Sequence, residues 1–128
     1  MASEMVIFTR TYDFISWLIP RLESFPRSQR FGVTRRLQDA ALDFYETITV
    51  ANNSRGEERR QLLRRADSHL DKVRFYLRLA VQWAWLNEGQ YQHAAQMVAE
   101  IGRLLGGWRK NPDGSDRAEG SPRAFGSA

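Results

Sequence analysis

Residues 57–87, EERRQLLRRADSHLDKVRFYLRLAVQWAWLN, form the longest helical pattern in the sequence. Apolar side chains recur in this stretch every three or four residues, at Leu63, Ala66, Leu70, Val73, Leu77, Ala80 and Ala84. This spacing matches the turn of an α-helix and places the side chains on one face. Glu57 and Glu58 suit the positive end of such a helix, and Ser54 or a neighbouring loop residue is expected to cap it. The stretch therefore predicts a long amphipathic helix that follows a loop at residues 52–56.

Two helices are predicted before this one. Residues 4–24 and 29–52 carry apolar stripes of the same period. Pro20 is expected to kink or interrupt the first of these helices, because proline lacks the backbone N–H that a helix interior needs. Pro26 separates the two segments and indicates a tight turn between antiparallel neighbours.

A fourth helix is predicted after the long one. Asn87-Glu88-Gly89 is expected to end the long helix, and a new apolar stripe then runs from Tyr91 to Trp108, with fraying at Gly106-Gly107. No strand pattern competes, and the connections are short. The sequence therefore predicts an all-α, up-down antiparallel four-helix bundle over residues 1–108. Residues 109–128 are polar and are expected to form a disordered tail.

Composition excludes several classes of function. The chain has 128 residues, no cysteine and two histidines. A disulfide scaffold, a thiolate zinc site, an iron–sulfur cluster and a cysteine nucleophile are therefore excluded. His69 and His93 are expected to be surface residues of helices, so neither a catalytic site nor a metal or cofactor site is predicted. No apolar run is long enough for a membrane span, and no signal peptide is apparent, so a cytoplasmic protein is expected.

Arginine dominates the basic residues. The chain has 19 basic and 15 acidic residues, a net charge of +4, and only Lys72 and Lys110 among the basic ones are lysines. Arginine pairs bidentately with phosphate, so the composition favours a polyanionic partner, although a GC-rich genome would also produce it. The arginines cluster, at Arg21, Arg27, Arg30, Arg35 and Arg36 and again at Arg59, Arg60, Arg64 and Arg65.

Two arginine pairs of the long helix are placed one turn apart, Arg60 with Arg64 and Arg74 with Arg78. Like charges at this spacing repel each other weakly, and a bound anion would relieve the repulsion. Phosphate contacts with a nucleic acid, with little readout of bases, are the functional prediction for these four arginines. A solvated face with internal salt bridges is the structural alternative.

The last part of the long helix carries a second apolar stripe, at Phe75, Leu79, Trp83 and Leu86. A bundle helix needs only one apolar face, so a second one indicates burial against another subunit. These four residues are therefore predicted to form a homo-oligomer interface. The alternative is that a loop or the first helix of the same chain covers them.

Several motifs together resemble a known family. They are Leu18-Ile19-Pro20, then Phe25-Pro26-Arg27 with Gly32, and above all residues 71–80 (DKVRFYLRLA) and 100–108 (EIGRLLGGW). In this order they resemble the four-helix-bundle family of accessory variability determinant proteins of diversity-generating retroelements and 23S ribosomal RNA intervening-sequence proteins. The similarity spans roughly residues 8–108.

The resemblance implies a homopentameric, barrel-like assembly with a basic surface. It implies an accessory protein, not an enzyme, that binds the reverse transcriptase of the retroelement and nucleic acid, and supports mutagenic copying of template RNA into cDNA. By position, Arg74 and Arg78 match the basic motif of the third helix, Arg27 the basic residue after the connecting proline, and Arg103 the one in the fourth helix. An intervening-sequence-type bundle protein and an arginine-rich protein-interaction scaffold without nucleic acid are the alternatives.

Overall fold

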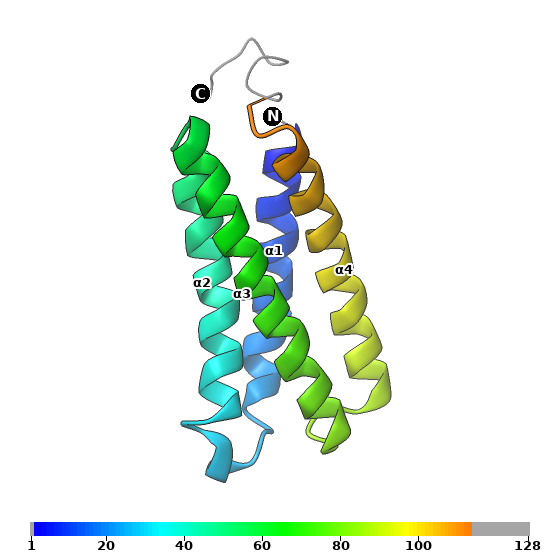
Figure 1. The fold of residues 1–128 in the computed structure, drawn as a ribbon. Coiled ribbons are helices and arrows are strands. Elements are labelled where there is room, and N and C mark those ends of the chain that lie inside the picture. Colours follow the sequence, from blue (N-terminus) through cyan, green and yellow to red (C-terminus); the bar gives the residue numbers. More distant parts are fainter. Residues whose placement is uncertain (1, 114–128) are drawn as a thin grey trace.

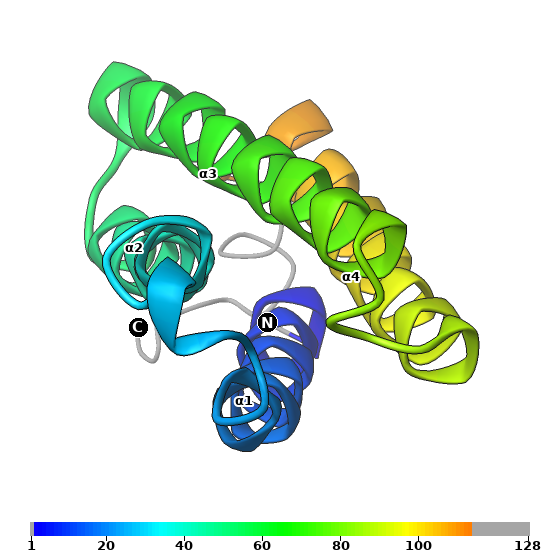
Figure 2. The same cartoon turned by 90° about the horizontal axis from the view of Figure 1, so that it is seen from below.

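Four helices form the fold of this computed structural model, which describes residues 2–113, with side chains from Val6 onward. They are α1 (Ala2–Leu22), α2 (Val33–Asn52), α3 (Gly56–Gln82) and α4 (Glu88–Lys110), and a short 3-10 helix, η1 (Arg27–Gln29), lies between α1 and α2. The helices run alternately up and down (Figure 1). Seen along the bundle, α1 lies beside α2 and α4, and α3 lies across from α1 (Figure 2). The predicted all-α, antiparallel four-helix bundle is confirmed.

The core follows the apolar stripes. Phe14 and Leu18 of α1, Phe44 and Ile48 of α2 and Ile101 of α4 are almost fully buried. From α3 the first stripe is buried, at Leu63, Ala66, Leu70, Val73, Leu77 and Ala80. Burial of large apolar side chains contributes about 1.5–3 kcal/mol each, so these stripes hold the four helices together.

The connection between α1 and α2 differs from its prediction. Pro20 lies in the last turn of α1, which is continuous and ends at Leu22. The second helix begins at Val33 and not at residue 29, because residues 27–32 form η1 and a turn in which the Gly32 N–H donates to the carbonyl of Gln29. Phe25, before this turn, is buried against the ring of Trp85.

The two ends of α3 also differ from the prediction. Arg55 precedes the first helical residue and makes no capping side-chain bond, while the Ser54 hydroxyl donates backward to the carbonyl of Val50. At its other end α3 stops at Gln82, five residues earlier than predicted. Ala84 has φ 61°, and the N–H groups of Trp85 and Leu86 both donate to the Ala80 carbonyl. This left-handed turn closes the helix in the way a glycine usually does.

Helix α4 begins with a capping box. The Asn87 side chain accepts from the N–H of Gln90, whose side chain accepts from the N–H of Asn87. Asn87 therefore starts α4 instead of ending α3. The helix does not fray at Gly106-Gly107 but runs to Lys110, two residues into the predicted tail. Residues 114–128 of that tail lie outside the described part of the chain.

Candidate functional site

A groove of about 510 Å³ lies between α3 and α4. Three of the arginines selected from the sequence line it: Arg74 and Arg78 from α3, and Arg103 from α4. The remaining lining is Leu77, Tyr91, Ala95, Val98, Ala99 and Gly102. The small residues on α4 leave the space that the groove occupies. The fold thus brings together three cationic side chains that lie up to 29 positions apart in the sequence.

Arg74 spans the groove toward α4. It is half-buried, its Nη1 donates to Asp71 Oδ1 over 2.8 Å, and its Nη2 lies against the backbone of Gly102. A Cβ atom at position 102 would overlap with that Nη2 atom, so glycine is what allows the guanidinium to lie there. The Asp71 pair is an exposed one, which contributes at most about 1 kcal/mol to folding.

Arg103 and Arg78 differ in their partners. Arg103 binds Glu100 with two bonds, from Nε over 3.3 Å and from Nη2 over 2.7 Å. Arg78 is exposed and has no hydrogen bond or ion pair within residues 2–113. Its charge is therefore available to a ligand, whereas each of the other two must share its guanidinium with a carboxylate.

Arg60 and Arg64 lie elsewhere. Along α3, Arg60 lies about 21 Å and Arg64 about 15 Å from Arg74, at the rise of about 1.5 Å per residue of a helix. Both donate to Glu57, over 3.0 Å and 3.2 Å, and these bonds, first that of Arg60, lower the pKa of the Glu57 carboxyl below its ordinary value. Together with Leu63, Arg109 and Pro112 they line a small pocket of about 90 Å³. The Glu57 carboxylate that they share relieves the repulsion between them within the chain.

Arg27 lies apart from both the groove and the Arg60–Arg64 pair. It is exposed on η1, at the end of the bundle where α1 connects to α2 (Figure 1). The six predicted arginines therefore divide into three groups, and the groove group alone includes predicted arginines from two helices.

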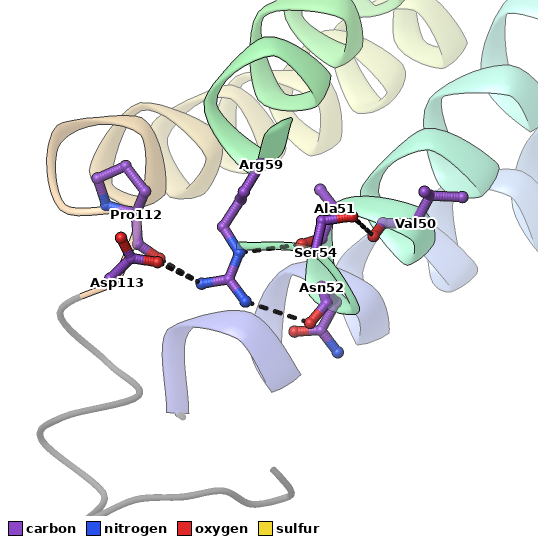
Figure 3. A network of polar contacts seen from close by, with 7 residues as sticks. All are labelled: Val50, Ala51, Asn52, Ser54, Arg59, Pro112 and Asp113. Atoms are coloured by element: carbon purple, nitrogen blue, oxygen red, sulfur yellow. Dashed lines mark hydrogen bonds and ion pairs between the residues drawn. The ribbon is translucent and has the colours of Figure 1, made fainter. Parts of the chain in front are cut away.

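Arg59 is structural, although the sequence groups it with the basic cluster. It is 3% exposed, and its Nε donates to the Ala51 carbonyl over 3.0 Å (Figure 3). Its Nη1 reaches the Pro112 carbonyl at 2.6 Å and Asp113 Oδ1 at 3.2 Å, and its Nη2 reaches the Asn52 carbonyl. This side chain joins the α2–α3 connection to the chain that follows α4. No spacing in the sequence distinguishes it from Arg60.

The predicted oligomer residues have unequal exposure. Phe75 and Trp83 are 52% and 54% exposed, and Leu79 is partly buried. Leu86 is 1% exposed and belongs to the core of the chain itself, so the expectation that it faces another subunit is wrong. The turn that ends α3 is the reason, because it directs residues 83–86 away from the helical path.

The two histidines occupy different environments. His93 is exposed and its ring lies 5.2 Å from that of Trp17. His69 is half-buried, contrary to the expected surface position, and its buried Nδ1 has no hydrogen-bond partner among residues 2–113. Desolvation by burial lowers the pKa of His69. The negative charge of Asp43 raises this pKa by a smaller amount, and the positive charge of Lys72 lowers it further. In residues 2–113 no group of acidic residues and histidines could hold a metal ion.

The sequence matches a family model described as bAvd-like over residues 5–112. The chain belongs to the bAvd-like family. This match covers all four helices of the bundle apart from the start of α1, and it supports the resemblance drawn from residues 71–80 and 100–108. The family is of the Avd accessory type, which is not catalytic. No curated protein matches the sequence. Among the described helices of this bAvd-like bundle, none has the length and apolar character needed to cross a membrane.

Proposed function

We propose that this bAvd-like chain is an accessory subunit of a diversity-generating retroelement that binds the reverse transcriptase and its template RNA or cDNA. The observation that carries the proposal is the groove in which Arg74, Arg78 and Arg103 converge. Arginine–phosphate contacts hold the nucleic acid near the polymerase, and each contact is weak and sensitive to salt. In this proposal the reverse transcriptase supplies the catalytic groups.

The proposed assembly is a ring-like homo-oligomer, a pentamer by resemblance. Its contact surface includes Phe75, Trp83 and Leu79. The rings of Phe75 and Trp83 are about half exposed on one protomer, and contact with a neighbouring subunit would remove this apolar surface from water. Each copy would add its groove arginines, so the positive potential of the assembly rises with the number of subunits.

The test is RNA binding of the double variant R74A/R78A across a salt series. Loss of two phosphate contacts makes the slope of log affinity against log salt concentration shallower by about 1.4–1.8, since each contact contributes roughly 0.7–0.9. The matched control R10A/R65A removes the same charge from exposed positions that do not line the groove. The proposal requires that only the groove variant loses RNA binding and polymerase-dependent cDNA synthesis. A folded R74A/R78A protein with wild-type binding and synthesis contradicts it.

A protein-interaction scaffold is the second candidate function. The apolar lining of the groove at Leu77, Val98 and Ala99 favours it, because phosphates do not contact apolar surface whereas the side chains of a protein partner do. In that case R74A/R78A loses the polymerase in a pull-down while RNA binding of the purified protein is absent in the wild type as well.

A further inference from the structure

The highest density of unpaired positive charge lies at the connection between α1 and α2. Residues 24–38 contain Arg27, Arg30, Arg35 and Arg36 and no aspartate or glutamate, so these fifteen positions carry +4, as much as the net charge of the whole chain. Within residues 2–113 none of these four guanidiniums has a carboxylate partner. Arg60, Arg74 and Arg103 all have one. This connection therefore attracts anions more strongly than the arginine pairs on α3 do.

An exposed aromatic ring lies among these charges. Phe31 is 73% exposed, the highest value among the large apolar residues of the described chain. The guanidinium carbons of Arg30 and Arg35 are 5.6 Å and 5.4 Å from its ring centroid. Both distances are within the range of a cation–π contact, which holds the guanidiniums beside the ring. The exposed ring and the guanidiniums beside it together offer a flat stacking surface and positive charge at one place.

We infer that Phe31, with Arg27, Arg30 and Arg35, binds an unpaired base of a single-stranded nucleic acid. The base stacks on the Phe31 ring in place of one guanidinium, and the displaced arginine and its neighbours contact the adjoining phosphates. Stacking on an aromatic side chain accepts every base, because every base has a planar face. An acidic peptide would neutralise the arginines, but its carboxylates would make no contact with the face of the ring. This inference rests on the proposed function for its ligand class and adds a second surface, outside the α3–α4 groove.

The test measures binding of a short oligouridylate RNA and of an RNA duplex to the full chain, by fluorescence anisotropy. F31A is expected to weaken binding of the single strand about tenfold, the loss of one stacked base, and to leave the salt slope unchanged because no charge is removed. Binding of the duplex is unchanged, since its bases are already stacked. F31W restores the affinity for the single strand, and photocrosslinking of an iodouridine-substituted RNA modifies position 31.

The matched control is Y12A, which removes another exposed ring, 66% exposed, that has no cation–π contact in the described structure. It should bind the single strand as the wild type does. If F31A loses binding of single strand and duplex equally, or not at all, the stacking site is wrong while the RNA-binding function stands. If F31A leaves RNA binding unchanged and the wild type binds a poly-glutamate peptide, the surface takes an acidic protein. If the wild type binds no RNA even at low salt, both this inference and the proposed function fail.

Discussion

The Arg74 guanidinium and the Gly102 backbone are in direct contact across α3 and α4, with no room between them for a single carbon. Arg74 extends along the α4 surface because position 102 lacks a side chain. The pair explains why Gly102 occupies the middle of a helix, where glycine costs about 1 kcal/mol relative to alanine. Position 102 thus controls the direction of a charge that belongs to another helix.

G102A is predicted to displace the Arg74 guanidinium without unfolding the bundle. The clash involves the far end of a flexible side chain, and alanine improves helix propensity, so the free energy of unfolding should be unchanged or rise by about 0.5–1 kcal/mol. The slope of log RNA affinity against log salt concentration should become shallower by about 0.7–0.9, which is the contribution of one phosphate contact, although no charge is removed. The control is G106A, where a Cβ meets no atom within 4 Å; it should gain stability and keep the wild-type slope. Equal slopes for the two variants would disprove the role of Gly102.

R59A is predicted to be strongly destabilising. Removal of the buried guanidinium leaves the carbonyls of Ala51, Asn52 and Pro112 without this donor, and lost bonds to a charged group cost about 1.5–3 kcal/mol. Urea unfolding measures the difference. R60A removes the neighbouring exposed arginine and should change stability by no more than about 0.5 kcal/mol. Similar midpoints for R59A and R60A would contradict the structural role assigned to Arg59.

A84G is predicted to stabilise the chain by about 0.5–1 kcal/mol. Ala84 is exposed and has φ 61°, a conformation that costs a residue with a Cβ about 1–2 kcal/mol, and the greater freedom of glycine in the unfolded chain offsets part of the gain. Thermal unfolding detects the change. A99G, at an exposed position inside α4, should lower stability by a similar amount. A lower melting temperature for A84G would show that the turn at the end of α3 does not require the left-handed conformation.

Stability is predicted to fall with acidification through the titration of His69. Its pKa is lowered in the folded state, so the unfolded chain binds the proton more tightly. The contribution of the neutral imidazole is present above its ordinary pKa of 6.5 and is lost as the pH falls below that value toward the lowered pKa. Urea unfolding at about pH 7.5 and about pH 5 should give a smaller decrease for H69Q than for the wild type. An identical decrease would assign the pH dependence to other groups.

F75D/W83D is predicted to convert the proposed homo-oligomer to a monomer. Both rings are about half exposed in one protomer, so the charges cost little within the chain but oppose burial at a subunit contact. Light scattering after size exclusion measures the mass, and Y12D, an equally polar change at an exposed ring, should keep the wild-type mass. A wild-type mass for F75D/W83D would move the contact to another face.

The apolar period predicted the helices and the core of α3 because burial requires one continuous face, as Leu63 to Ala80 show. The ends of the helices were harder to predict from the sequence. The stop after Gln82 uses an alanine where glycine is usual, so the sequence Trp83-Ala84-Trp85 reads as more helix. The start of α4 did have a signal, since Asn87 and Gln90 have the spacing of a capping box.

The groove arginines could be selected from the sequence only one helix at a time. Arg74 and Arg78 stood out by their spacing, whereas their meeting with Arg103 depends on how α3 and α4 pack. Arg59 could not be recognised, because a buried arginine and an exposed one look alike until the carbonyls around them are known. Phe31 has no such signal in the sequence, because a lone aromatic residue in a turn belongs to no periodic pattern.

The Arg59 network has a practical consequence for how the molecule is tethered. It holds Pro112 and Asp113 beside the α2–α3 connection, at the end of the bundle opposite η1 (Figures 1 and 3). Whatever is attached after Asp113 therefore starts from that end. An attachment made at Asp113 leaves η1, with Phe31 next to it, at the end of the bundle farthest from the attachment.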